Sequence, residues 1–116
     1  MRELAYRLLH DLRVIGINTE GFELVLRPFS KTYFGRYIVA KKRIILYVYS
    51  DPERKERYAY SELIKILIHE VVHHLQHEDP DYIRYKGIMH DAEFKAMYEH
   101  YLGKYYRTKI TSRVRR

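Results

Sequence analysis

The chain of 116 residues contains no cysteine, which excludes a disulfide framework and every cysteine-based zinc ribbon. The absence of disulfides fits a reducing compartment, so we expect a cytoplasmic protein. No apolar run approaches the length of about 20 residues that a membrane-spanning helix needs, and no membrane partner is expected. The N-terminal residues 1–16 alternate charged residues with leucine and lack the apolar stretch of a signal peptide.

Acidic residues are missing from the last fourteen residues, 103–116, although the chain as a whole carries a net charge of +7. Six of the seven net charges therefore belong to this segment, which favours a nucleic-acid partner, single- or double-stranded DNA included. A solvated basic tail is the alternative. We expect a core over residues 1–103 and a basic C-terminal tail over residues 104–116. The candidate nucleic-acid-binding residues are Lys104, Arg107, Lys109, Arg113, Arg115 and Arg116.

The segment from Tyr58 to His77 has the apolar periodicity of one long helix. Within it lies His69-Glu70-Val71-Val72-His73. Because residues four apart share a helix face, His69 and His73 can hold one metal ion, and Glu70 is rotated by about 100°. Its carboxylate is then placed to take a proton from a metal-activated water, as in zinc hydrolases. The apolar positions of this helix are Tyr60, Leu63, Ile64, Leu67, Ile68, Val71 and Leu75.

The remaining pattern predicts a small α+β domain without repeats or linkers. Leucines at helical spacing indicate a helix over Met1–Arg13, and a last helix runs from about Asp91 to Leu102, ending at Gly103. Alternating apolar residues predict a small, mostly antiparallel sheet that packs on the central helix and is flanked by the other helices. Its three strands are expected at Phe22–Arg27, Tyr33–Ala40 and Arg43–Tyr49.

A catalytic zinc site takes three ligands from the protein and leaves one position open. His90 is the preferred third ligand, because it opens the last helix after a connector long enough to fold back. Glu93, one turn further on, is the second choice. Nothing in the sequence selects a residue that stabilises the transition state; Tyr82, Tyr85 and basic residues near the connector are candidates.

These two motifs, His69-Glu70-Val71-Val72-His73 and, sixteen residues later, His90-Asp91-Ala92-Glu93-Phe94, resemble the SprT-like family, which includes the Spartan-type proteases of DNA–protein crosslinks. Asp91 stands where that family often has glycine, and the family's Cys-rich ribbon is absent. The resemblance covers most of the chain and implies a zincin metalloprotease core.

In such a core one Zn²⁺ is held by His69, His73 and His90, and Glu70 is the general base and later the acid that protonates the leaving amine. The resemblance also implies an edge strand beside the metal helix that pairs with the substrate backbone. Either Arg43–Tyr49 or Tyr33–Ala40 fits that role.

Three functions are compatible with this sequence. The first is a zinc metalloendopeptidase that acts on DNA-associated proteins, and the second is a zinc-bearing nucleic-acid-binding module without protease activity. The third is a zincin peptidase that cleaves a regulator and has no nucleic-acid role. Glu70 favours an enzyme, because a structural zinc site has no use for a general base.

Overall fold

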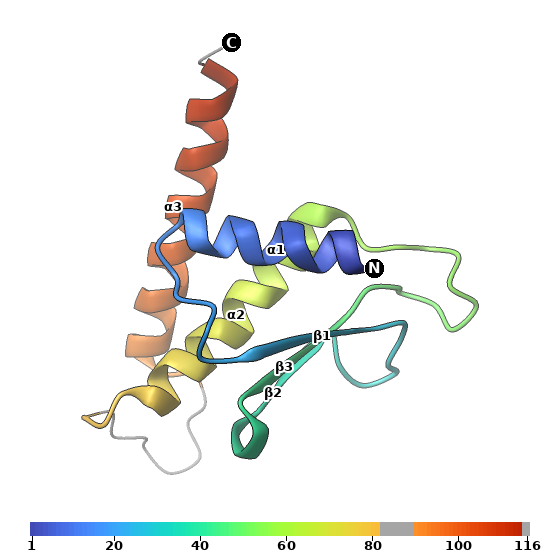
Figure 1. Cartoon of the computed structure of the whole chain (residues 1–116), viewed down its shortest axis with the longest axis horizontal. Helices are drawn as coiled ribbons and strands as arrows, with labels where there is room; N and C mark the ends of the chain where they lie inside the picture. Colours follow the sequence, from blue (N-terminus) through green and yellow to red (C-terminus); the bar gives the residue numbers. More distant parts are fainter. Residues whose placement is uncertain (82–89, 115–116) are drawn as a thin grey trace.

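The computed structural model describes residues 1–81 and 90–114 (Figure 1), with side chains described up to residue 109. None of the helices in these ranges is both long and apolar enough to cross a membrane. The elements in chain order are α1 (Arg2–Val14), β1 (Glu23–Arg27), β2 (Gly35–Ile38), a short 3-10 turn η1 (Val39–Lys41), β3 (Arg43–Tyr47), α2 (Tyr60–Glu78) and α3 (Ala92–Val114).

The α+β class is confirmed, with a three-stranded sheet in the order β1-β3-β2. The expectation of a mostly antiparallel sheet was wrong in one respect, because β1 pairs parallel with β3 while β2 pairs antiparallel with it. The chain reverses once between β1 and β2 and again at η1, so β3 runs in the direction of β1. The strand β3 is central, and its consecutive residues Ile44, Ile45 and Leu46 are all buried, as a position with neighbours on both sides requires.

The central helix α2 has the predicted bounds to within two residues and contributes six of the sixteen buried core residues that the structure describes, more than any other element. Its apolar stripe belongs to one hydrophobic cluster with Ile44 and Leu46 of β3 and with Leu8 and Leu12 of α1. The stripe buries residues at steps of three and four, as an amphipathic helix between two layers must. These residues are Leu63, Ile64, Leu67, Ile68, Val71 and Val72.

The predicted end of the last helix at Gly103 was wrong, because α3 continues without a break to Val114. Glycine in a helix interior costs only about 1 kcal/mol relative to alanine, so packing can override it. Tyr105 supplies that packing, since it is only 5% exposed and belongs to the same core as Leu8 and Phe94. The division of the chain at residue 103 stays a prediction.

Candidate metal centre

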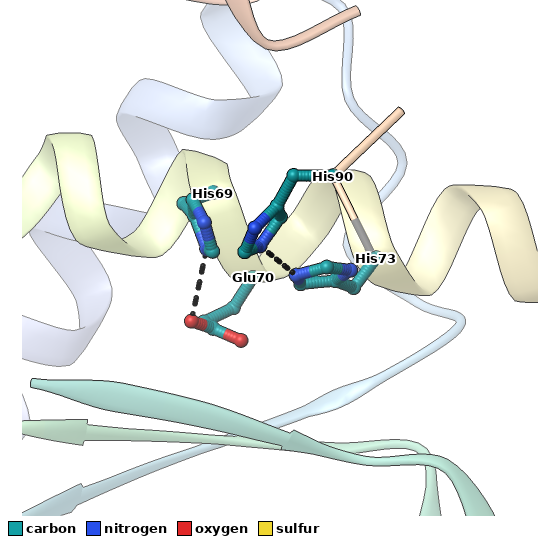
Figure 2. Close-up of polar contacts among 4 residues, drawn as sticks. All are labelled: His69, Glu70, His73 and His90. Atoms are coloured by element: carbon teal, nitrogen blue, oxygen red, sulfur yellow. Dashed lines mark hydrogen bonds and ion pairs between the residues drawn. The ribbon is translucent and has the colours of Figure 1, made fainter. Parts of the chain in front are cut away.

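Three histidines converge from two elements (Figure 2). His69 and His73 project from successive turns of α2, and His90 reaches them from the bend just before α3. One ring nitrogen of each lies within 4.8 Å of the others. Nε2 of His73 is 3.2 Å from Nε2 of His90. Two ligand nitrogens on a tetrahedral zinc ion, each about 2.05 Å from the metal, are separated by about 3.3 Å. The spacing therefore suits two ligands of one ion.

A single buried ring, that of Phe94, supports all three imidazoles. Its centroid lies 4.9 Å from that of His69, 4.6 Å from that of His73 and 4.7 Å from that of His90. Phe94 is only 3% exposed and belongs to the hydrophobic core. The orientation of the three histidines is therefore tied to core packing.

Asp91 explains why α3 begins directly after His90. The backbone N–H of Phe94 donates a hydrogen bond to Oδ1 of Asp91 at 2.8 Å, which is the side-chain N-cap of a helix. The backbone N–H of Lys95 bonds to the Asp91 carbonyl oxygen at 3.0 Å and closes the first turn. The aspartate thus fixes the helix start, and with it the place of His90 next to α2.

Glu70 lies beside the histidine group and is not part of it. Its carboxylate points from α2 toward the sheet, and Oε2 is 3.1 Å from Nδ1 of His69 (Figure 2). The residue is only 7% exposed, a rare state for a glutamate in the absence of a specific partner or function.

Two of the three imidazoles, those of His73 and His90, have the protonation state that metal binding requires. Burial, with contributions from neighbouring histidines, lowers the pKa of His73 to about 4. Burial and the nearby His69 also lower the pKa of His90. Both rings are therefore neutral at neutral pH, and only a neutral imidazole can donate a lone pair to a metal. The residues present fit a zinc ion in spacing and in donor chemistry.

A cleft passes the histidine group between α2 and the segment that contains β2. It has two recesses, of about 390 Å³ and about 340 Å³, which share Tyr33, Gly35, His69 and Glu70. The larger recess contains the three histidines together with residues of β2 and η1. The smaller one extends to the other side of Glu70. Its further lining residues are Thr32, Phe34, Lys65, Ile66 and Tyr98.

The strand β2 is the edge strand beside the histidine group, because β3 is central and Gly35, Arg36 and Tyr37 of β2 line the recess that contains the three histidines. Of the two strands predicted as candidates for substrate pairing, only the one within Tyr33–Ala40 is therefore at an edge. A hydrogen-bonding contact also joins β2 to α2, since the hydroxyl of Tyr37 lies 2.9 Å from Nδ1 of His74. His74 is buried and packs edge-on against Phe22, so it faces away from the metal group.

Comparison with protein-family models and with curated protein sequences gives no match. Among solved structures, the fold is similar to that of the metallopeptidase zymogen of Pyrococcus abyssi abylysin. The TM-score is 0.53 at 22% sequence identity, over 97% of this chain and 96% of that chain. At this identity the likeness concerns the fold.

The predicted site residues fall into two sets. His69, His73 and His90 come together next to Glu70, whereas the alternative ligand Glu93 is exposed and outside the group. Of the predicted basic residues, Lys104, Arg107, Lys109 and Arg113 lie on α3, and none of them belongs to the histidine group. Tyr82, Tyr85, Arg115 and Arg116 lie outside the described residues, as does the side chain of Arg113.

Two of the basic residues on α3 have neighbours within the domain. Nζ of Lys109 is 3.8 Å from Oδ2 of Asp11. Lys104 approaches the turn that follows α1, since its Nζ would lie 3.3 Å from a Cβ atom added to Gly16. The side chain of Arg107 stays exposed.

Sequence reasoning missed the aromatic residues around the site. Phe94 and Tyr98 follow His90 at steps of four, so they lie on the face of α3 that meets α2. That spacing was visible in the sequence and could have identified both. Tyr33 and Phe34 precede β2 and line the cleft, but their role depends on the strand order, which the sequence does not reveal.

Proposed function

We propose that this chain is a zinc-dependent metalloendopeptidase of the SprT-like type. His69, His73 and His90 hold one zinc ion, and Glu70 is the catalytic acid–base. The observation that carries the proposal is the convergence of three ring nitrogens within 4.8 Å, beside a buried carboxylate that is not one of them. A structural zinc site needs four protein ligands and no base, whereas the part of the chain that the structure describes brings three ligands and a base together.

A zinc ion bound there would act as a Lewis acid that polarises the scissile carbonyl and acidifies water. Glu70 removes the proton from the attacking water and then delivers it to the leaving amine. Its 3.1 Å contact with His69 and its burial hold the carboxylate in one position. Pre-organisation of this kind removes the need to order the base during the reaction.

The substrate proposed is an extended stretch of protein or peptide. Such a chain would lie in the cleft and add a strand to the open edge of β2, with its scissile bond next to Glu70. The likeness to a metallopeptidase zymogen in fold supports a peptidase over other hydrolases.

We further propose that the substrates are DNA-associated proteins, and the positive charge of residues 103–116 supports this. The partial pairing of Lys109 with Asp11 removes some of that support. A peptidase that cleaves a regulator without nucleic acid is the alternative, and the charge variants described in the Discussion distinguish the two.

The decisive experiment compares wild type with Glu70→Gln on unfolded protein substrates, with and without DNA, in the presence of zinc. Glu70→Gln should retain the metal and the fold and lose cleavage by about 100-fold or more, because the water loses its base. Glu93→Gln, a matched change at an exposed position, should leave cleavage unchanged. Zinc-loaded wild type that cuts none of these substrates would instead favour a binding module.

A further inference from the structure

The smaller recess of the cleft differs from the larger one because its lining is mainly aromatic and apolar. Its walls are formed by the rings of Tyr33, Phe34 and Tyr98 and by the side chain of Ile66. Its volume of about 340 Å³ lies within the range of about 300 to 1,000 Å³ usual for ligand sites. The space can hold a large side chain that enters from the cleft.

Aromatic groups at this recess are left uncovered by the domain. Phe34 is 61% exposed, and its described ring contact is an edge-on one with Tyr58 at 5.9 Å. Tyr33 is also exposed. Adjacent exposed aromatic rings that border a cleft are typical of surfaces that a ligand covers. The rings border the two residues of the proposed catalytic machinery that the recess contains, His69 and Glu70.

The exposed rim of the recess carries a positive charge, whereas the negative charge of Glu70 is buried. Lys65 lies one helical turn before His69 on α2, so it projects on the same side and forms part of the rim. Lys65 and Glu70 are the two Lys, Arg, Asp or Glu residues among the described lining residues of this recess, and Lys65 is exposed to solvent. A basic group on the ligand would meet its repulsion and an acidic one its attraction.

We propose that this recess is a specificity pocket that binds a large apolar or aromatic side chain of an extended peptide, with an acidic residue preferred beside it. The inference rests on the proposed peptidase function and names the substrate class of that same site. The partner is identified by chemical complementarity: apolar walls for the side chain and the Lys65 ammonium for the neighbouring carboxylate.

Binding is measured on the full chain carrying Glu70→Gln, so that no cleavage interferes. The probes are short fluorescein-labelled peptides of glycine, serine and alanine with a central Phe-Asp, Ala-Asp or Phe-Lys pair. Their binding is measured by fluorescence anisotropy with and without zinc. Phe-Asp should bind about tenfold more tightly than Ala-Asp, from burial of one ring. It should bind about threefold more tightly than Phe-Lys, the scale of an exposed charge pair. Both ratios should persist without zinc.

Two variants at exposed positions test the walls and the rim separately. Phe34→Ala should bring the Phe-to-Ala ratio close to one, and Lys65→Glu should reverse the Asp-to-Lys preference while the ring preference stays. Val14→Ala is the matched control, because Val14 is a 49% exposed apolar residue at the end of α1 that lines neither recess of the cleft. It should change neither ratio.

The outcomes separate the pocket from the peptidase. Peptide preferences as described, together with a zinc-loaded wild type that cleaves nothing, would support the pocket and overturn the proposed function. Equal binding of the three peptides, no binding, or ratios that Phe34→Ala leaves unchanged would overturn the pocket. Sedimentation analysis of each variant adds a further outcome. A wild-type dimer that Phe34→Ala dissociates would assign the exposed rings to a second copy and overturn the proposal.

Discussion

Gly35 of β2 and Glu70 of α2 lie so close that a Cβ atom added to Gly35 would be 3.4 Å from Cγ of Glu70. The same atom would be only 2.8 Å from Cγ2 of Ile66, which is closer than real Cβ contacts come. The absence of a side chain at residue 35 therefore lets the edge strand approach the proposed base.

Gly35→Ala should push β2 away from α2. We expect a loss of about 1 to 3 kcal/mol in the free energy of unfolding, as for other overpacked sites, and a clear loss of peptidase activity. The double variant Gly35→Ala/Ile66→Ala should recover part of the activity, because the 2.8 Å contact is gone. Chemical denaturation and a peptide-cleavage assay measure the two effects, and an unchanged Gly35→Ala enzyme would contradict the described packing.

Gly103→Ala should increase the free energy of unfolding, which is the opposite of the effect expected for Gly35→Ala. Gly103 lies in the interior of α3, and a Cβ there meets only the flexible end of Arg107, at 3.2 Å. Alanine in a helix interior is favoured over glycine by about 0.5 to 1 kcal/mol, so the midpoint of unfolding should rise. A destabilised Gly103→Ala would instead favour the helix end at this glycine that the sequence pattern predicts.

Zinc content should depend on His90 and not on Glu93. His90→Ala removes one of the three converging nitrogens and should lower bound zinc sharply, as measured by native mass spectrometry. Glu93→Ala, three residues further on and exposed, should bind zinc like the wild type. Equal zinc in wild type and His90→Ala would remove His90 from the ligand set.

Tyr60→Phe should destabilise the junction of α1 and α2. The Tyr60 hydroxyl donates a hydrogen bond of 2.5 Å to Oδ2 of Asp11, and loss of a bond to a charged group costs about 1.5 to 3 kcal/mol. Burial, followed by the bond to Asp11, raises the pKa of Tyr60 above its ordinary value of 10.0. The stabilisation is therefore complete below pH 10 and is lost as the pH rises above that value. Denaturation curves of the two proteins should differ at neutral pH and approach each other as the pH rises above 10.

The nucleic-acid link needs charge variants, because a chain cut at Gly103 would also lose Tyr105 from the core. Replacing Arg107, Arg113, Arg115 and Arg116 by glutamine should make the log–log salt dependence of DNA affinity shallower. The slope should change by roughly 0.7 to 0.9 for each DNA phosphate that the protein no longer neutralises. Glutamine at four exposed cations elsewhere, Arg2, Lys31, Arg36 and Lys55, provides the control. Identical curves for the two variants would favour a peptidase without a nucleic-acid role.

The sequence revealed features that depend on local periodicity. The bounds of α2, the shared face of His69 and His73, and the place of His90 near the start of α3 all follow from spacing along one helix or from its first residues. Asp91 also fits its helix-start position by residue type alone.

Features that depend on packing between distant segments could not be predicted from local periodicity in the sequence. The parallel pairing of β1 with β3 depends on which strand takes the centre, and strand propensity does not decide that. The continuation of α3 past Gly103 depends on a pocket for Tyr105 in the core. The two recesses around Glu70 require Gly35 to face α2, a contact between residues far apart in the chain.

Because Phe94 belongs to the hydrophobic core and also supports the three histidines, folding and the proposed metal binding would form one coupled equilibrium. A ligand that binds only the native state raises stability by about 2.7 kcal/mol when its free concentration is 100 times its dissociation constant. The reciprocal also holds: a substitution that loosens the core under Phe94 weakens metal affinity without touching a ligand. The supply of zinc would then control how much of this protein is folded, as well as how much of it is active.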